Sequence, residues 1–509
     1  MSKELALELK GITKTFGSVV ANNNVSLDVY KGEILAVLGE NGCGKTTLMN
    51  MIAGIYYPDS GEIICNGKPV VIRSPKDAFD NKIGMVHQHF KLVDIFTAGE
   101  NIVLGDESKG HYNLNEVNNR VLEITKRYGF TIDPKKKIYE MSVSEKQTVE
   151  IIKVLYRNAD ILILDEPTAV LTPQETETLF KVLRNMKADG KSIIIITHKL
   201  HEVLEISDRV AVLRKGEHIA TVNTCDATES SLTEMMVGQK VSLNIKRNEP
   251  KNPVVRLKVD NLSTVDPEGL PVLRNISFEA KSGEILGIAG IAGSGQRELL
   301  ESIAGLYRVE NGSITYNDPK TGDTVNLRDK TPLQIRNLGV RLSFVPEDRL
   351  GMGLVGNMNI TDNMMLRSYR RGKSIFLDRE KPKALAERII ESLQVNTPGT
   401  QTEVRKLSGG NVQKVLVGRE IAAAPTVLMV AYPVRGLDIN SSYTIYNLLN
   451  AQKENGVSVI FVGEDLDVLL ELCDRIMVVN SGAITGICDA RTVTKEEIGL
   501  LMTKSEKRN

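Results

Sequence analysis

The chain has 509 residues, 41% of them hydrophobic and 25% charged, and its 64 basic residues balance 64 acidic ones, which argues against a protein that coats nucleic acid. A single hydrophobic core stops growing at roughly 250–300 residues, so this length predicts two large domains. No basic-then-apolar leader opens the sequence, and no apolar run reaches the ~20 residues that cross a bilayer, so neither secretion nor a membrane span is expected.

The first motif along the chain is a phosphate-binding loop, "GENGCGKT" at residues 39–46, which fits the pattern G-x-x-x-x-G-K-[ST]. It follows an apolar strand at 33–38 and precedes a helical pattern at 46–55, the context that the motif needs. Glycines let the backbone N–H groups face phosphate oxygens, and the positive end of the helix dipole adds to them. A glycine-rich turn without a ligand is the alternative, which this context disfavours.

We therefore predict an ATP site at this loop. Lys45 is placed to reach the β and γ phosphates, and the Thr46 hydroxyl to bind Mg²⁺. Cys43 lies close to a helix N-terminus, where the pKa of a thiol tends to fall, and its alkylation is expected to slow hydrolysis. The loop residues predicted to bind ATP are Gly39, Asn41, Gly42, Cys43, Gly44, Lys45, Thr46 and Thr47.

Two apolar stretches further along, "ADILIL" at 159–164 and "SIIIIT" at 192–197, are strand-sized and β-branched and predict buried strands. The first is followed by two carboxylates, Asp165 and Glu166. Asp165 suits the Mg²⁺ shell, usually through water, and Glu166 is placed to orient or deprotonate the attacking water. A carboxylate pair that caps the turn before Pro167 is the alternative, which the preceding phosphate loop disfavours.

The sequence contains an internal repeat. "MSVSEKQ" from Met141 matches "LSGGNVQ" from Leu407, and two later pairs, at 161 and 427 and at 197 and 463, keep the same offset of 266 residues. The phosphate loop at Gly39 matches a loop at Gly290 with an offset of 251, so the second half carries a net insertion of 15 residues. A repeat of this length is a duplicated domain and not a solenoid, whose periods run roughly 20–50 residues.

Each half alternates strands with helical patterns, which predicts an α/β fold with a mostly parallel sheet flanked by helices. The polar stretch from Lys240 to Val254 contains two prolines and lacks apolar periodicity, so the boundary between the halves is expected there. The predicted organisation is a first domain at 1–240, a linker at 241–254, a second domain at 255–503 and a solvated tail at 504–509.

The chain resembles ABC-type ATPases over nearly its full length. The discriminating motif is the signature "LSGGN" at Leu407–Asn411, whose counterpart in the first half is the poorer "MSVSE" at Met141–Glu145. The resemblance implies two tandem P-loop ABC-type ATPase domains, each with a mostly parallel sheet core, an antiparallel β part and a helical subdomain. It implies ATP and Mg²⁺ as ligands.

The resemblance also implies roles for isolated residues. Gln88 in "MVHQHF" would link the Mg²⁺ site to a membrane partner, His198 would touch the γ-phosphate, and Phe16 would stack on adenine. Without the family, a lone His is more often a satisfied turn residue and a lone Phe part of a core. The implied catalytic residues are Lys45, Gln88, Glu166 and His198, the implied Mg²⁺ ligands are Thr46, Gln88 and Asp165, and the implied signature contacts to ATP are Ser408, Gly409 and Gly410.

The second half has lost these chemical groups. Gln296 and Arg297 replace the loop lysine and hydroxyl, Ala431 and Tyr432 replace the carboxylates, and Glu464 and Glu347 stand at or near the His and Gln positions. Hydrolysis in this half is not expected. Because ABC proteins close their halves head to tail on ATP, the resemblance pairs the first phosphate loop with the signature at 407–411 and with Asp438, and the altered loop with 141–145.

Two fused halves with a weakened second loop resemble the ATPase subunits of monosaccharide and nucleoside importers, and "VHQHFKLVDIFTAGENIVLG" looks closest to the nucleoside-type branch. The resemblance implies an ATPase at the cytoplasmic face of the cell membrane, with two integral membrane permease subunits and an extracytoplasmic solute-binding protein, and without nucleic acid. The segment 89–101 should dock a permease helix, so Phe96→Ala should uncouple transport. The alternatives are a soluble tandem ABC ATPase acting on ribosomes or nucleic acid, and a non-hydrolysing scaffold.

Overall fold

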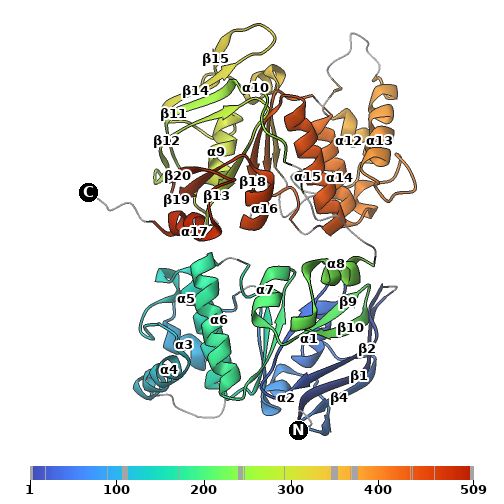
Figure 1. The fold of residues 1–509 in the computed structure, drawn as a ribbon, viewed down its shortest axis with the longest axis vertical. Coiled ribbons are helices and arrows are strands. Elements are labelled where there is room, and N and C mark those ends of the chain that lie inside the picture. The colour runs from blue at the N-terminus through green and yellow to red at the C-terminus, as the bar shows by residue number, and fades with distance from the viewer. Residues whose placement is uncertain are drawn as a thin grey trace. The chain divides into compact units, whose positions relative to one another are not determined.

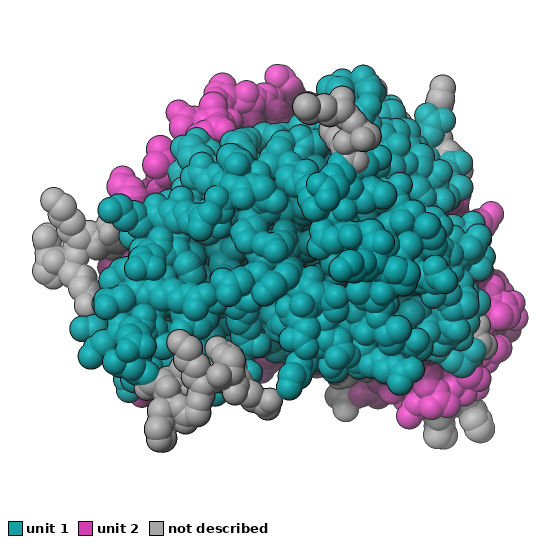
Figure 2. Space-filling model, turned by 90° about the horizontal axis from the view of Figure 1, so that it is seen from below, with its two compact units in different colours: residues 1–242 teal, residues 243–509 magenta. Residues whose placement is uncertain are grey.

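The computed structural model describes residues 4–17, 19–88, 90–105, 113–169, 171–238, 245, 247–291, 293–344, 353–366, 368–369, 377–422, 424–435, 437, 439–463 and 465–504. The chain forms two compact units, residues 1–242 and 243–509, which Figure 2 distinguishes by colour. Each unit contains a six-stranded sheet, a four-stranded sheet and a set of helices.

A six-stranded sheet forms the centre of unit 1, with the strand order β10-β9-β3-β8-β7-β6 (Figure 1). Its strands are β3 (Ile34–Leu38), β6 (Ile83–Val86), β7 (Ile161–Asp165), β8 (Ser192–Ile196), β9 (Arg209–Arg214) and β10 (Glu217–Asn223). Neighbouring strands pair in parallel except β9 and β10, which are antiparallel. Strands β7 and β8 are buried along their whole length, which confirms the prediction from their β-branched sequences.

The second sheet of unit 1 is antiparallel and has the order β2-β1-β4-β5. Its strands are β1 (Leu5–Phe16), β2 (Val19–Tyr30), β4 (Ser60–Cys65) and β5 (Lys68–Val70). Helix α1 (Lys45–Ile52) places Leu48 in one buried apolar cluster with Leu7 of β1 and Ile194 of β8. This cluster therefore joins the two sheets and fixes the helix that follows the phosphate loop.

The opposite face of the central sheet is covered by helices. Because side chains alternate along a strand, Leu164 of β7 and Ile195 of β8 point away from α1 and share a cluster with Phe180 of α6. The helices and 3₁₀ turns that complete this part of unit 1 are α2 (Pro75–Asp80), α6 (Pro173–Ala188), α7 (Leu200–Ile206), α8 (Glu229–Val237), η1 (Ile138–Glu140) and η2 (Thr224–Asp226).

A helical subdomain lies at one end of unit 1, away from the antiparallel sheet (Figure 1). It consists of α3 (Ala98–Val103), α4 (Leu114–Tyr128) and α5 (Val143–Tyr156). Ile102, Val121 and Ile152, one from each helix, belong to a separate buried cluster. The apolar spacing of these helices thus forms a small core of its own, and the predicted three-part architecture is confirmed in this unit.

Unit 2 repeats the architecture. Its central sheet has the order β16-β17-β18-β13-β19-β20, and its antiparallel sheet the order β12-β11-β14-β15. The strands are β11 (Val255–Val265), β12 (Pro271–Lys281), β13 (Ile285–Ala289), β14 (Asn311–Asn317), β15 (Thr324–Asn326), β16 (Val340–Phe344), β17 (Val427–Ala431), β18 (Ser458–Val462), β19 (Arg475–Asn480) and β20 (Ala483–Asp489). The helices are α9 (Gln296–Ile303), α10 (Pro332–Leu338), α12 (Ile360–Met365), α13 (Glu380–Ser392), α14 (Gly409–Ile421), α15 (Ile439–Glu454), α16 (Leu466–Leu472) and α17 (Lys495–Thr503), with a 3₁₀ turn η3 (Val404–Lys406). The duplication predicted from the repeat is confirmed.

The stretch predicted as a linker is held in part by unit 2. Arg247 donates to the carbonyl oxygens of Leu470 and Cys473 at 2.8 and 2.6 Å, and Lys453 Nζ donates to the carbonyl of Asn248. The tail residues 505–509 lie outside the described residues, and the boundaries 1–240 and 255–503 remain predictions. Within the described part of the chain, no helix is long and apolar enough to cross a membrane.

Candidate active site

The phosphate loop of unit 1 lies between β3 and α1, and its glycines are required by the backbone. Gly44 has φ of 98°, in the left-handed region, and caps α1. A Cβ atom there would lie 2.3 Å from the carbonyl oxygen of Ala21, and one at Gly39 would lie 2.3 Å from that of Leu213. The close approach of neighbouring backbone therefore explains the two glycines independently of any ligand.

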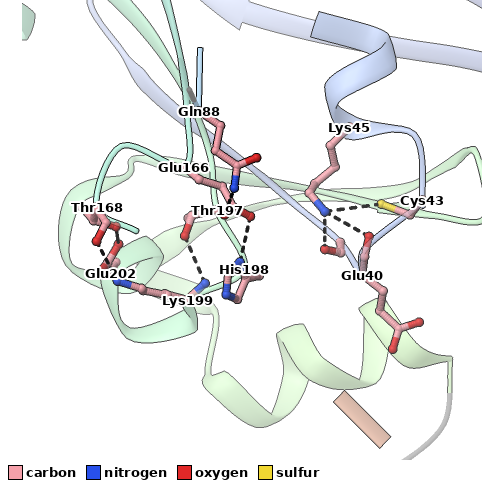
Figure 3. A network of polar contacts seen from close by, with 11 residues as sticks. Glu40, Cys43, Lys45, Gln88, Glu166, Thr168, Thr197, His198, Lys199 and Glu202 are labelled. Carbon is pink, nitrogen blue, oxygen red and sulfur yellow. Dashed lines mark hydrogen bonds and ion pairs between the residues drawn. The ribbon is translucent and has the colours of Figure 1, made fainter. Parts of the chain in front are cut away.

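Lys45 is buried at the start of α1 and its ammonium is held by the loop itself. Nζ donates to the carbonyl oxygens of Gly39 at 2.6 Å and Glu40 at 3.0 Å (Figure 3). A buried ammonium needs such partners, because desolvation without them is costly. The positive charge is thus stored beside the loop backbone, where the motif predicts that phosphate oxygens bind.

Cys43 does not have the lowered thiol pKa expected from its place before a helix. Burial raises the pKa of Cys43, and the nearby charge of Lys45, with Nζ 3.9 Å from Sγ, only partly opposes this effect. The thiol packs against Gly39, where an added Cβ would lie 2.5 Å from Sγ. Desolvation inside the loop outweighs the helix dipole, and the expectation of a lowered pKa is wrong.

The two carboxylates follow the end of β7 as predicted, and they differ in environment. Burial, and then the charge of Glu166, raises the pKa of Asp165 to about 6, although Lys45 and a hydrogen bond from the Thr46 side chain act in the opposite direction. That hydrogen bond brings together two of the predicted Mg²⁺ ligands. A hydroxyl and a carboxylate are oxygen ligands of the kind that Mg²⁺ takes in phosphate sites, so these residues fit the metal.

Three predicted catalytic residues meet at Glu166. Gln88 Nε2 donates to Glu166 Oε2 at 3.2 Å, and His198 Nδ1 lies 2.9 Å from Glu166 Oε1 (Figure 3). Burial would raise the pKa of Glu166, but the hydrogen bond and charge of His198, with Lys45 and Lys199, hold it below its usual value. The three residues follow β6, β7 and β8, which are adjacent parallel strands, and the carboxyl ends of such strands form the binding edge of an α/β sheet.

Phe16 ends β1 with 43% of its surface exposed. Its ring meets Tyr56 edge-on, with 5.2 Å between the ring centroids. Asp59 accepts hydrogen bonds from Lys14 Nζ at 2.8 Å and from the backbone of Thr15 at 2.7 Å, and these contacts lower the pKa of Asp59 to about 2. Sequence reasoning missed Tyr56 and Asp59, because they lie about 40 residues from Phe16 along the chain and only the pairing of β1 with β4 brings the segments together.

The two signature segments differ at the start of their helices. Ser142 and Glu145 form a reciprocal capping box at the N-terminus of α5, with the serine backbone donating to the Glu145 carboxylate at 2.7 Å. Among the described residues, the Ser408 side chain makes no cap hydrogen bond at α14, and it accepts instead from Asn411 Nδ2 at 2.9 Å. Thus a carboxylate occupies the positive end of α5, whereas the first turn of α14 has no acidic residue.

The second phosphate loop keeps its backbone and loses its charge. Gly295 has φ of 99°, close to the value at Gly44, and the neutral Gln296 donates from Nε2 to the carbonyl of Ile291 at 3.1 Å. Tyr432 follows β17 with φ of 53°, as Glu166 follows β7 with φ of 48°. The chain therefore repeats the same turns with different side chains; Glu347, Asp438 and Glu464 lie outside the described residues.

A lysine-bearing loop after one strand, a carboxylate pair after another and a signature helix define a nucleotide-hydrolysing domain of the P-loop type, built twice. The chain belongs to the ABC transporter family, whose model matches residues 22–169 and 273–433.

The chain is similar along its whole length to named importer subunits. It is 42% identical to the nucleoside import ATP-binding protein NupA of Lactococcus lactis subsp. cremoris over 99% of both chains. It is 42% identical to the guanosine import ATP-binding protein NupO of Bacillus subtilis over 99% of this chain and 98% of that relative. A putative ribose/galactose/methyl galactoside import ATP-binding protein of Burkholderia cenocepacia is 36% identical, over 97% and 93% of the two chains.

One solved structure covers nearly the full length. It is the complex of an archaeal ribosomal stalk protein with the archaeal ribosome recycling factor aABCE1, with a TM-score of 0.61 and 16% identity over 94% of this chain and 90% of that one. At this identity the likeness concerns the fold alone, and it agrees with two tandem ABC-type domains.

Proposed function

We propose that this chain is the ATP-binding and hydrolysing subunit of an ABC importer that powers uptake of a nucleoside or a simple sugar. The observation that carries the proposal is the hydrogen-bonded group of Gln88, Glu166 and His198, in a chain 42% identical along its length to a nucleoside import ATP-binding protein. This group supplies a base, and Lys45 supplies a fixed charge, so the residues of unit 1 suffice for phosphoryl-transfer chemistry.

Each residue of unit 1 has a role in the proposal. Lys45 and the loop backbone bind the phosphates, and Glu166 orients the attacking water and accepts its proton while His198 holds the carboxylate. Mg²⁺, held by Thr46, Asp165 and Gln88, neutralises phosphate charge when bound. Phe16 stacks on adenine. The signature of the other half completes the site when the two halves close, through Ser408, Gly409 and Gly410.

The same proposal assigns the partners. Two integral membrane permease subunits and an extracytoplasmic solute-binding protein would carry the solute, with this chain at the cytoplasmic face. The segment after Gln88 would dock the permease. Within it, Ile95 is 69% exposed whereas Phe96 is partly buried, so Ile95 is the better probe of docking. Ile95→Ala should reduce solute uptake while leaving basal ATP hydrolysis within twofold.

The experiment is to co-express the tagged chain with its permeases and identify what co-purifies. Permease subunits, together with ATP-driven uptake of a labelled nucleoside or pentose in proteoliposomes, support the importer. Ribosomal RNA in place of permeases would support a soluble tandem ATPase and overturn the proposal. Comparing guanosine with ribose as the transported solute then separates the two branches.

A further inference from the structure

Three polar side chains beside the Glu166–His198 pair join the turn after β7 to the turn after β8 (Figure 3). Thr168 Oγ1 donates to Glu202 Oε2 at 2.5 Å. Lys199 Nζ donates to the other carboxylate oxygen, Glu202 Oε1, at 3.0 Å and to the carbonyl of Thr168 at 3.0 Å. Thr168 lies two residues after Glu166 and Lys199 directly after His198, so this group links the segments that carry both candidate catalytic side chains.

The linking group is deeply buried. Thr168 is 2% exposed and Glu202 is 4% exposed. A carboxylate in such surroundings is tolerated only with good partners, and here a hydroxyl and an ammonium supply them. Because each partner also holds a different turn, any shift of one turn against the other would break a hydrogen bond to a buried charge. The group therefore resists sliding of the two turns.

Unit 2 contains the same two turns without this polar group. Val434 stands at the position of Thr168 and Val468 at that of Glu202, each 266 residues further along, and both pack against an apolar cluster. The backbone hydrogen bond between the turns is the same in both units: Glu166 N to Ile196 O, and Tyr432 N to Val462 O, both 2.9 Å.

The fold of the turns therefore does not need the buried charge, since apolar side chains fill the equivalent positions of unit 2. Apolar replacements of buried ion pairs are often neutral or stabilising, so stability alone gives little reason to keep Glu202. The polar group accompanies Glu166 and His198, and it is absent where Tyr432 stands in place of the base. This correlation within one chain points to a role in catalysis.

We propose that Thr168, Lys199 and Glu202 are positioning residues that hold Glu166 and His198 in register for ATP hydrolysis. The inference rests on the proposed function of unit 1 as the hydrolysing half. Catalytic geometry tolerates displacements of only about 0.5 Å, and a misplacement of about 1 Å can lower a rate ~100-fold. A base that drifts relative to its histidine partner would leave the phosphate loop, and hence ATP binding, unaffected.

The test is the variant Thr168→Val/Glu202→Val, which gives unit 1 the side chains of unit 2. We expect kcat of the full-length chain to fall at least tenfold, the KM for ATP to stay within twofold, and the midpoint of thermal unfolding not to fall. Thr168→Ser, which keeps the hydroxyl, should retain activity. The matched control is Glu205→Gln, which removes an exposed ion pair with Arg184 on the same helix α7 and should leave kcat unchanged.

A positioning role also predicts that the effects are not additive. In a His198→Ala background the double variant should cause less than a twofold further loss, because the group would act through a side chain already removed. An unchanged kcat, or a full tenfold further loss in that background, would overturn the inference. Thr168→Val alone serves if the double variant unfolds. A wild-type chain that does not hydrolyse ATP would instead refute the proposed function itself.

Discussion

At the scale of single residues, the backbone of Glu166 is a clear case of local strain at the site. Its φ of 48° lies in a region that non-glycine residues avoid, at a cost of about 1–3 kcal/mol. Tyr432 in unit 2 has nearly the same conformation, with φ of 53°. The strained turn thus belongs to the fold, and the side chain placed on it decides whether the turn carries a base.

This argument predicts the effect of Glu166→Gln. Glutamine keeps the size and one hydrogen-bonding oxygen toward His198, so the turn should keep its geometry, but it cannot accept the proton of water. We expect kcat to fall about 100–10,000-fold with ATP affinity retained. Steady-state hydrolysis and equilibrium nucleotide binding on the same preparation measure both quantities. Hydrolysis near the wild-type rate would remove Glu166 from the role of base.

Cys43 allows a second prediction at this scale. Because burial raises the pKa of its thiol, alkylation should be slower there than at Cys225, which is exposed in the same chain. Bound MgATP should slow it further, and the adduct should block hydrolysis by its bulk. Mass spectrometry of both sites over time provides the comparison. Equal labelling of the two thiols would show that Cys43 is not enclosed by the loop.

The residues that sequence could identify are those whose chemistry is written in local spacing. Lys45, Thr46 and the carboxylates stand in motifs after strands, so their placement at the sheet edge followed from pattern alone. The contact of Thr168 with Glu202 spans 34 residues and depends on how two turns approach, and nothing in the local sequence marks it. The direction of the Cys43 pKa shift likewise depends on packing against Gly39.

At the scale of elements, the two signature helices show how a similar motif serves different ends. The spacing of Ser142 and Glu145 fits a capping box, and α5 begins with one. In α14 the third helical residue is Asn411, so Ser408 is not engaged by a carboxylate. The first helix uses its serine for its own N-terminus, whereas the second leaves its positive end open to an anion.

A pair of matched variants tests this difference. Ser142→Ala removes a cap and should destabilise unit 1 by about 0.5–2 kcal/mol, with little effect on hydrolysis. Ser408→Ala removes no cap hydrogen bond among the described residues and should change stability by less than about 0.5 kcal/mol, but it should lower kcat. Calorimetric unfolding and ATPase assays of both proteins distinguish the cases. Equal destabilisation by the two variants would contradict the assigned caps.

At the scale of the whole molecule, the duplication was readable from constant offsets, and the layered α/β architecture followed from alternating strand and helix patterns. Which unit holds the polar site was also readable, since Lys45 and Glu166 have neutral counterparts in Gln296 and Tyr432. The extent of the linker was harder to predict, because Arg247 is polar in sequence yet binds two carbonyl groups of unit 2. Polar composition marks a boundary but not which contacts it makes.

The last prediction concerns both halves, because the proposed closure would pair the first phosphate loop with the second signature. A hydrogen-bond donor that contacts phosphate only in the closed state should affect turnover more than ATP binding, and losing one typically lowers rates about 100–1000-fold. Ser408→Arg and Gly410→Asp should therefore nearly abolish hydrolysis by the chain assembled with its permeases. Ser142→Arg and Ser144→Asp should be milder, since the pocket they would face already lacks the lysine and both carboxylates. ATPase rates of the four variants, with thermal unfolding to exclude general destabilisation, rank them directly. The reverse order, with the first-half changes abolishing activity and the second-half changes silent, would mean that each signature serves the phosphate loop of its own half.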